Sequence, residues 1–408
     1  MPLNSQERDP KDLEASDDRA EAPLLPGPHR KAVTSPQLNQ VPSQRHDDRL
    51  GGDRSNPGSQ RKAFLLASIV LLAVACVEFG IALPTLFSSS TAFHFPGLRH
   101  YPRFLVIGDW GRQGRENQTV VADAMAQKAK SFRPDFIVST GDNFYETGLV
   151  SYDDPAFDLS FRNVYNHSEL QVPWLVALGN HDYGEASSND KPDCTKASKS
   201  SGECYFGPSH QLDIRLVRRD PRWHCERTFS KTYADGAVEI FFIDTTPIIS
   251  SYADESWATN RGGVLQQSWE DQVRELEARL ARSQADWKLV VGHHPIRTNH
   301  RSDLMYVDMV DRVEPLLIKY GVQLYMCGHD HNLQYIYNPE RGYHQITSGA
   351  GSQIGSGFYG DKDSPFQYAA NGFVTVAVGR NSLRVEYLGV DTNQPLFVVD
   401  VPRHVNYA

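Results

Sequence analysis

The sequence predicts a mixed α/β body that follows an N-terminal tail and one membrane-spanning helix. Three features carry this prediction. An apolar stretch, residues 63–87, is long enough to cross a bilayer as a helix, which needs about 20 residues. Short apolar runs recur after it, and each ends in glycine followed by a polar residue. Amphipathic segments separate the first of these runs, as helices separate strands in an α/β fold.

Residues 1–62 differ in composition from the rest of the chain. They contain many Pro, Ser, Gln and Asp residues, no aromatic residue, and as many acidic as basic side chains. Such a segment buries too little apolar surface to offset the loss of chain entropy on folding. The composition therefore predicts a disordered tail.

Residues 63–87 predict a transmembrane signal-anchor helix. Glu78 is the one charged residue of this stretch, tolerable near a membrane interface, and Pro84 marks the expected end of the helix. A cleaved signal peptide is the main alternative, but its charged leader normally has only a few residues. A buried soluble helix is a second alternative, which the lack of a water-facing side disfavours.

The charges that flank this stretch predict a single-pass, type II membrane protein. Several Arg and Lys residues precede the stretch, whereas few basic residues follow it before Arg99. The positive-inside rule therefore places the tail in the cytosol and the rest of the chain in the secretory lumen or outside the cell. Two glycosylation sequons, at Asn117 and Asn166, agree with this orientation. A linker, 88–102, then leads to one globular domain, 103–408.

The globular domain opens with strand-like runs that end in polar clusters. Helices are predicted over 119–132, 268–282 and 309–320, and Ser268 is a capping residue for the second of them. Strands are predicted in FLVIGDWG, DFIVSTGDNFY, WLVALGNHD, KLVVGHHP and QLYMCGHDH. In α/β sheets functional groups gather at the carboxyl ends of strands, where these polar clusters stand.

Four later runs have fewer helices between them: HQITSGAG, FVTVAVG, SLRVEYLG and PLFVVDV. They predict a second, largely antiparallel sheet.

Composition excludes several classes of protein. Hydrophobic residues make up 40% of the chain, which excludes wholesale disorder. The net charge of −9 argues against a nucleic-acid partner, which requires a basic face. Five cysteines are too few for a disulfide scaffold of this size.

Cys194, Cys204 and Cys225 cluster in one polar stretch, where a disulfide would leave one thiol over, and the sequence leaves the pairing open.

The polar residues after the five strands form a set of candidate metal ligands. Carboxylate, phenolate, amide and imidazole groups are more numerous than a single tetrahedral site can use, and they predict two metal ions bridged by a carboxylate. A phenolate favours a trivalent ion such as Fe(III), which acidifies its bound water strongly. The candidates are Asp109, Asp142, Tyr145, Asn180, His181, His293, His294, His329 and His331.

These motifs resemble those of the purple acid phosphatases, within the calcineurin-like metallophosphoesterase superfamily. The family carries DxG, GDxxY, GNH, VxxH and GHxH in this order, and all five are complete here. They stand at Asp109–Gly111, Gly141–Tyr145, Gly179–His181, Val290–His293 and Gly328–His331. The details GDNFY, GHDHNLQY and SGAG are most similar to the small, tartrate-resistant animal-type branch. The resemblance covers roughly residues 103–395.

The resemblance implies a fold of two packed β-sheets flanked by helices and a dinuclear metal centre. Fe(III) and a second, divalent metal (Fe, Zn or Mn) are the implied cofactors. The implied ligands of Fe(III) are Asp109, Tyr145 and His331. The implied ligands of the divalent ion are Asn180, His293 and His329, with Asp142 bridging the two ions.

The resemblance also implies an acid phosphatase that hydrolyses phosphate monoesters by attack of a metal-bound hydroxide. The implied substrate is a small phosphomonoester or a phosphoprotein.

His181 follows a ligand and is placed to bind the phosphate or protonate the leaving group. The family uses a second histidine after VxxH. His300 is the nearest match, at a shorter spacing than in the animal branch, and His294 is the alternative. Asp182 and Asn143 are expected to orient the ligands.

Other functions are compatible with the same residues. A phosphodiesterase or nucleotide pyrophosphatase would keep the metals and change the substrate. A non-hydrolytic binding protein would normally have lost a ligand, and all seven are present. An iron pair is also able to catalyse redox chemistry, which the sequence does not separate from hydrolysis.

Overall fold

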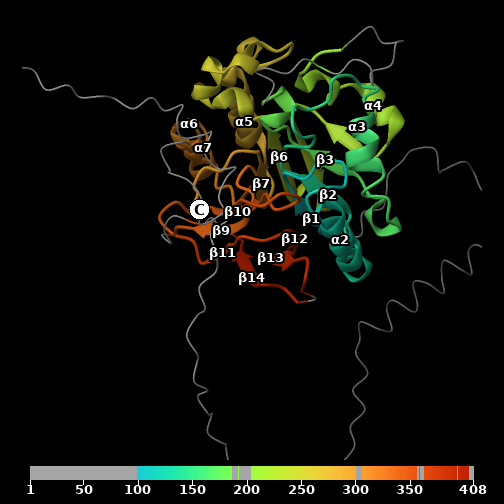
Figure 1. The fold of residues 1–408 in the computed structure, drawn as a ribbon. Helices are drawn as coiled ribbons and strands as arrows, with labels where there is room; N and C mark the ends of the chain where they lie inside the picture. Colours follow the sequence, from blue (N-terminus) through green and yellow to red (C-terminus); the bar gives the residue numbers. More distant parts are fainter. Residues whose placement is uncertain are drawn as a thin grey trace, which may run out of the picture. The chain divides into compact units, whose positions relative to one another are not determined.

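The computed structural model describes residues 99–185, 192, 204–299, 306–355, 358, 363–392 and 394–403 (Figure 1). The chain divides into two units, Met1–Ala92 and Phe93–Ala408, and every described residue belongs to the second unit. The predicted tail and membrane-spanning helix therefore lie outside the described residues. Within the described part of the chain, no helix is both long enough and apolar enough to cross a bilayer.

The first sheet has seven strands in the order β14-β13-β12-β1-β2-β3-β4. β1 to β4 are parallel to one another, while β12, β13 and β14 continue the sheet from β1 in antiparallel fashion. The strand bounds are β1 (Arg103–Ile107), β2 (Phe136–Ser139), β3 (Trp174–Val176), β4 (Trp223–Cys225), β12 (Gly372–Val378), β13 (Ser382–Gly389) and β14 (Phe397–Pro402).

The second sheet also has seven strands, in the order β11-β9-β10-β8-β7-β6-β5. β6, β7, β8 and β10 are parallel, and β5, β9 and β11 pair antiparallel with their neighbours. The strand bounds are β5 (Thr228–Tyr233), β6 (Val238–Ile243), β7 (Trp287–Val291), β8 (Leu324–Cys327), β9 (Leu333–Tyr337), β10 (His344–Ser348) and β11 (Phe366–Tyr368).

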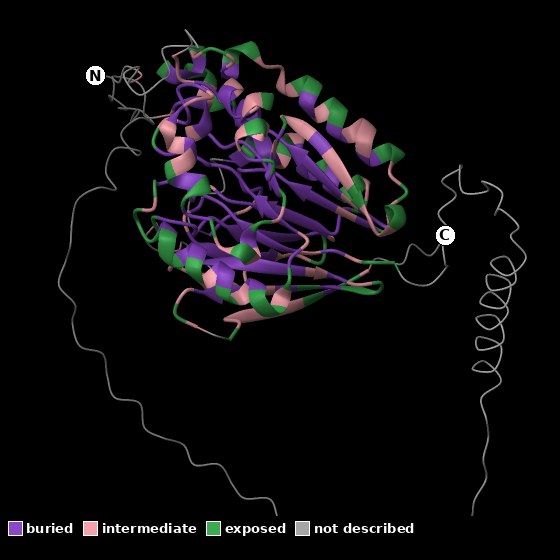
Figure 2. Ribbon diagram, turned by 90° about the vertical axis from the view of Figure 1, so that its right-hand side faces the viewer, coloured by how far each residue is buried: buried purple, intermediate pink, exposed green. Residues whose placement is uncertain are grey.

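The two sheets pack face to face, and helices cover their outer sides. Val106 and Val374 of the first sheet share a buried cluster with Leu289 of the second. A separate cluster joins Met125 of α2 to the outer face of the first sheet, and Leu276 of α5 belongs to another on the second. Figure 2 shows the strands mostly buried, with the exposed positions on the helices and loops. The α-helices are α2 (Gln118–Phe132), α3 (Pro155–Phe157), α4 (Ile214–Arg219), α5 (Trp269–Arg282), α6 (Val307–Arg312) and α7 (Glu314–Lys319).

The structure confirms most of the predicted elements of the body. The five apolar runs that end in polar clusters are β1, β2, β3, β7 and β8. The predicted helices 119–132 and 268–282 are α2 and α5. The hydroxyl of Ser268 caps α5, accepting a hydrogen bond from the backbone N–H of Asp271 at 3.1 Å.

Two predictions about these elements are wrong. The single helix expected over 309–320 is two helices, α6 and α7, which meet at Val313. Pro315 lacks the backbone N–H that a continuous helix would use, and its ring clashes with the preceding turn. The late strands do not form a separate antiparallel sheet, since β12 to β14 extend the first sheet and β10 lies parallel to β8 in the second. An apolar run indicates that a strand is buried, but it does not indicate with which other strand it pairs.

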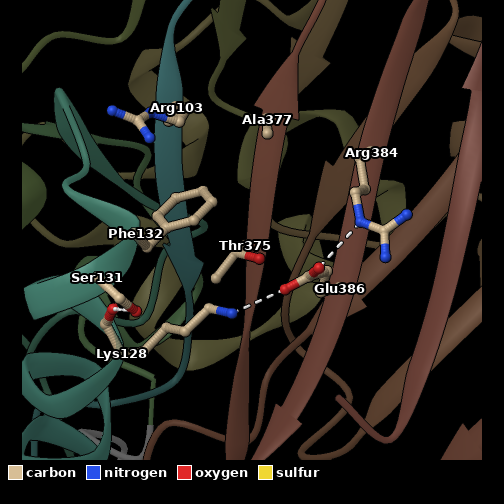
Figure 3. Close-up of a pocket in the computed structure, with 8 residues that line it drawn as sticks. All are labelled: Arg103, Lys128, Ser131, Phe132, Thr375, Ala377, Arg384 and Glu386. Atoms are coloured by element: carbon tan, nitrogen blue, oxygen red, sulfur yellow. Dashed lines mark hydrogen bonds and ion pairs between the residues drawn. The ribbon is translucent and has the colours of Figure 1, made fainter. Parts of the chain in front are cut away.

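A pocket of about 350 Å³ lies on the outer face of the first sheet, between α2, β1, β12 and β13 (Figure 3). Arg103, at the start of β1, lines this pocket. The pocket therefore lies at the opposite end of β1 from Asp109. The carboxylate of Glu386 accepts hydrogen bonds there from Lys128 (2.8 Å) and Arg384 (2.9 Å). None of the candidate ligands lines this pocket.

Candidate metal centre

Five loops bring the predicted ligands together, one after each of β1, β2, β3, β7 and β8. Parallel strands present their carboxyl ends at the same edge of a sheet, so the loops of each sheet are neighbours. The first sheet supplies Asp109, Asp142 and Asn180, and the second supplies histidines. The backbone N–H of His329 donates to the carboxylate of Asp109 at 3.0 Å, which ties the loops of the two sheets together.

The backbone of these loops is unusual at the predicted ligands. Asp109, Asp142 and His329 have φ of 59°, 51° and 65°, in the left-handed region that residues other than glycine rarely adopt. Two glycines make room for the ligands. A methyl group added to Gly141 would lie 2.7 Å from Nδ1 of His293, and one added to Gly179 would lie 2.2 Å from Oδ1 of Asp142. The glycines of the GD and GN motifs are therefore required for close approach of the loops.

Asp109, Tyr145 and His331 form one group of converging atoms. The phenol oxygen of Tyr145 lies 2.9 Å from Nε2 of His331 and 3.3 Å from Oδ1 of Asp109. The same phenol donates a hydrogen bond to Oδ2 of Asp142 at 2.9 Å. Two carboxylates, a phenol and an imidazole thus meet at one point, which is a ligand set suited to a hard trivalent ion.

Asn180, His293 and His329 form a second group beside the first. Oδ1 of Asn180 lies 2.9 Å from Nε2 of His293 and 3.0 Å from Nδ1 of His329. Nε2 of His293 is 3.4 Å from Oδ2 of Asp142, the oxygen that also contacts Tyr145. A single carboxylate oxygen therefore borders both groups, as expected of a bridging ligand.

Burial and neighbouring charges shift the pKa values of several groups in the site. Burial raises the pKa of Asp109 well above its usual value, and burial and the neighbouring carboxylates do the same to Tyr145. Burial acts to raise the pKa of Asp142 too, but His293 and His181 outweigh it and lower this pKa. Burial acts to lower the pKa of His293, yet Asp142 raises it to about 10. The residues fit metal ions because a multivalent cation offsets this concentration of acidic groups better than protons do.

Neighbouring polar groups hold the ligands in place. The carbonyl of Thr140 accepts a hydrogen bond from Nδ1 of His293 at 2.9 Å, which leaves Nε2 facing the site. The buried carboxylate of Asp182 accepts from the backbone N–H groups of Asn143 (3.0 Å) and Gly179 (2.9 Å). Asp182 thereby links the loop of Asp142 to the loop that precedes Asn180. The expectation that Asp182 and Asn143 support the ligands agrees with these contacts.

His181 lies at the edge of the site. Its backbone N–H donates to Oδ1 of Asp142 at 3.0 Å, and its Nδ1 lies 2.6 Å from the carbonyl oxygen of Glu146. The ring packs beside Tyr145, with ring centroids 4.4 Å apart. Burial acts to lower the pKa of His181, but Asp142, Glu185 and Glu146 raise it above its usual value.

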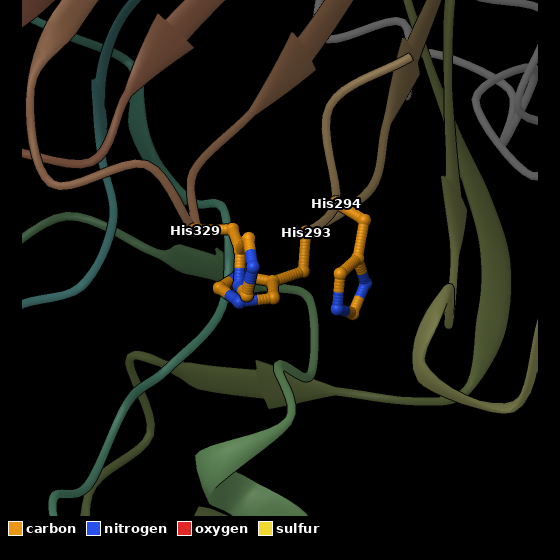
Figure 4. A group of neighbouring side chains, drawn as sticks. All are labelled: His293, His294 and His329. Atoms are coloured by element: carbon orange, nitrogen blue, oxygen red, sulfur yellow. The ribbon is translucent and has the colours of Figure 1, made fainter. Parts of the chain in front are cut away.

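His294 lies beside the second group. It is one of the candidate ligands of the sequence, although the resemblance assigns it to neither metal ion. The imidazoles of His293, His294 and His329 are neighbours after β7 and β8 (Figure 4), and their candidate ligand atoms lie within 4.8 Å of one another. Both nitrogens of His294 have partners in the protein, Thr245 Oγ1 at 2.8 Å and the Tyr252 hydroxyl at 3.0 Å. The other candidate for the second acid-site histidine, His300, lies outside the described residues.

Two residues of the site have no counterpart among the sequence-predicted candidates. The guanidinium carbon of Arg112 lies 3.8 Å from the ring centroid of Tyr145, and its Nη1 is 2.6 Å from Oε1 of Glu146. The carboxylate of Glu185 accepts a hydrogen bond from Nδ2 of Asn180. Neither belongs to a motif, so only their contacts in the fold identify them.

The remaining predictions concern the glycosylation sequons and the cysteines. Asn117 and Asn166 are both exposed, and Nδ2 of Asn117 donates to Oδ1 of Asn371 at 2.9 Å. Cys204 is disulfide-bonded, whereas Cys225 is buried and free. Cys194 lies outside the described residues.

Comparison with known proteins identifies relatives of this fold and site. Residues 102–333 match the family model of the calcineurin-like phosphoesterases. Purple acid phosphatase 4 of Arabidopsis thaliana is 36% identical over 342 residues, covering 80% of this chain and 91% of that enzyme. The tartrate-resistant acid phosphatase type 5 of Homo sapiens is 30% identical, covering 74% of this chain and 91% of the human enzyme.

A solved structure of lower identity shares the fold. GAP50, the anchor in the inner membrane complex of Plasmodium, matches with a TM-score of 0.56 at 23% identity, covering 75% of this chain and 90% of the other. At this identity the likeness shows the fold alone. The family model spans more than half of the chain, and the enzyme relatives align over most of it. The chain therefore belongs to the calcineurin-like phosphoesterase family and, within it, to the purple acid phosphatases, a group of phosphomonoester hydrolases with a dinuclear metal centre.

Proposed function

We propose that this chain is an acid phosphatase that hydrolyses phosphate monoesters at a centre of Fe(III) and a divalent metal. The position of Asp142 carries the proposal, because its Oδ2 lies 2.9 Å from the Tyr145 phenol and 3.4 Å from Nε2 of His293. One carboxylate oxygen between two groups of ligand atoms is what a bridged metal pair requires.

The ligands divide between the two ions by their chemistry. Asp109, Tyr145 and His331 would hold Fe(III), since a phenolate is a hard, strongly electron-donating ligand that favours a trivalent ion. Asn180, His293 and His329 would hold the divalent ion, which is Fe, Zn or Mn. A metal pair held by these residues would supply an activated water as nucleophile and would neutralise charge on the phosphoryl oxygens.

Side chains around the ligands prepare the site for the reaction. Nδ1 of His181 hydrogen-bonds to the carbonyl of Glu146, which turns Nε2 away from that loop. An imidazole in this place is suited to donate a proton to the departing alkoxide. Arg112 stacks on the Tyr145 ring and pairs with Glu146, so it holds the phenol in place.

Small phosphomonoesters or phosphoproteins are the proposed substrates. A phosphodiesterase or nucleotide pyrophosphatase would use the same metal site, and a non-hydrolytic binding protein would keep the ligands without turnover. Hydrolysis of 4-nitrophenyl phosphate at acid pH, with bis(4-nitrophenyl) phosphate as the matched diester, separates the three. The proposal requires monoester cleavage that exceeds diester cleavage. Preference for the diester would favour the second function, and no cleavage of either would favour the third.

The proposed setting is a type II membrane protein with its active site in the secretory lumen or outside the cell. The apolar stretch 63–87, the basic residues before it and the two sequons support this setting. Asn117 and Asn166 are exposed, as glycan attachment requires. Alkaline carbonate extraction of membranes from expressing cells tests the anchor, since an anchored chain stays in the pellet and a peripheral one is released.

A further inference from the structure

The amide of Asn180 has two ends, and only its oxygen could bind a metal ion. Its Oδ1 faces Nε2 of His293 (2.9 Å) and Nδ1 of His329 (3.0 Å). Its Nδ2 faces the opposite way and donates to Oε2 of Glu185. A metal ion accepts electron pairs from the oxygen and is repelled by the NH₂ group, so a rotation of the amide by half a turn would remove this ligand.

We propose that Glu185 is a positioning residue for the divalent-ion site, an inference that rests on the proposed function. An ionised carboxylate accepts hydrogen bonds and donates none. Glu185 therefore pairs with the NH₂ end of Asn180 and excludes the flipped amide, in which two acceptors would face each other. The hydrogen bond also increases the electron density on Oδ1, as outer partners of metal ligands commonly do.

The fold holds Glu185 in reach of Asn180 through a short, well-anchored turn. Residues His181–Tyr183 form one turn of 3-10 helix, and Gly184 follows with φ of 96°. The carbonyl of Tyr183 accepts a hydrogen bond from Nδ2 of Asn260 at 3.0 Å. The left-handed glycine reverses the chain so that the next side chain returns to the loop of Asn180.

Glu146 provides a matched control on the same rim. It is also a carboxylate beside His181, but its Oε1 pairs with Nη1 of Arg112 at 2.6 Å instead of with a predicted ligand of the divalent ion. Glu146→Gln and Glu185→Gln each remove one negative charge near the centre. Glu185→Gln can still present an oxygen to Nδ2 of Asn180, whereas Glu185→Ala cannot.

The test is the dissociation constant for Zn²⁺ at the second site, measured by competition with a chromogenic chelator on the full chain loaded with iron. We expect Glu185→Ala to weaken Zn²⁺ binding by about tenfold or more. Glu185→Gln and Glu146→Gln should each weaken it by only about threefold, the effect of one lost charge. The colour of the iron site should stay unchanged in the two Glu185 variants, and excess Zn²⁺ should restore turnover in Glu185→Ala.

Three results would overturn the inference. A Zn²⁺ constant for Glu185→Ala within twofold of the wild type removes the role of Glu185 and leaves the proposed function standing. Equal losses in Glu185→Ala and Glu146→Gln assign the effect to charge instead of amide orientation. A wild-type chain that binds a single metal ion overturns the proposed function itself, and the inference falls with it.

Discussion

His181 is the residue whose proposed role is most sharply testable by substitution. Its side chain contacts the Glu146 carbonyl and the Tyr145 ring, and its backbone contacts Asp142. Because the imidazole belongs to neither group of converging ligand atoms, its removal should leave the metals in place. Its proposed role is to protonate the leaving group, and this protonation increases the rate most when the leaving group is a poor one, such as an alkoxide.

We predict that His181→Asn lowers kcat by about a hundredfold for an alkyl phosphate and by much less for 4-nitrophenyl phosphate. The nitrophenolate leaves without a proton, so it bypasses the missing acid. Steady-state kinetics on both substrates, with metal content measured in parallel, checks this. Equal losses on the two substrates, or loss of metal, would contradict the proposed role.

At the scale of the loops, the lack of a side chain at Gly179 allows the loops that carry the candidate ligands to approach each other. Gly179 lies against the loop of Asp142, and an added methyl group would be 2.2 Å from Oδ1 and 2.4 Å from the backbone nitrogen of that residue. Backbone atoms cannot yield as a flexible side chain does, so the loops after β2 and β3 must separate. The carboxylate of Asp142, the proposed bridging ligand, would then leave its place between the two groups.

We predict that Gly179→Ala loses most of its bound metal while its secondary structure persists. Gly321→Ala is the control, because Gly321 has φ of 62° and no atom lies within 4 Å of an added methyl group. The control should lose about 1 kcal/mol of stability and keep its metals. Elemental analysis of both variants, with far-ultraviolet circular dichroism, measures the difference. Full metal content in Gly179→Ala would show that the loops adapt.

Local patterns predicted the elements that carry the ligands, but they did not predict how the elements assemble. Each strand before a ligand is a short apolar run with glycine after it, a signal contained in neighbouring residues. The pairing of β12 with β1 joins residues far apart in the chain, and nothing in either run specifies the partner. Pro315 was a visible signal for the break between α6 and α7, which the apolar spacing of 309–320 obscured.

The candidate ligands were predictable for the same local reason, and so were Asp182 and Asn143, which stand inside or beside the motifs, whereas Arg112 and Glu185 were not. Asp109, Asp142 and Asn180 stand two, three and four residues after the ends of β1, β2 and β3, so a pattern of types and order is enough to select them. Arg112 and Glu185 act through contacts with Tyr145 and Asn180 that depend on the loop conformations. An arginine or glutamate outside a motif is usually a solvated surface residue, and its sequence position gives no contrary signal.

At the scale of the whole molecule, the orientation across the membrane makes a prediction about glycosylation. Asn117 and Asn166 are both exposed. Nδ2 of Asn117 donates to Asn371 and Asn117 directly precedes α2, whereas Asn166 lies outside the helices and strands. We predict that the chain carries glycan when made in a secretory pathway, with higher occupancy at Asn166 than at Asn117. Glycosidase digestion of Asn117→Gln and Asn166→Gln variants measures both sites. A chain that carries no glycan at either site would contradict the lumenal orientation.

The most direct test of the dinuclear phosphatase is a visible absorption spectrum of the purified full-length chain, recorded with its hydrolysis of 4-nitrophenyl phosphate at acid pH. A phenolate bound to Fe(III) gives a purple charge-transfer band, so we predict a purple protein with turnover. Tyr145→Phe should lose the colour, and Asp142→Asn should lose both colour and turnover. A colourless wild-type protein that still hydrolyses the substrate would contradict the Tyr145–Fe(III) assignment, and a purple protein without turnover would contradict the proposed phosphatase activity.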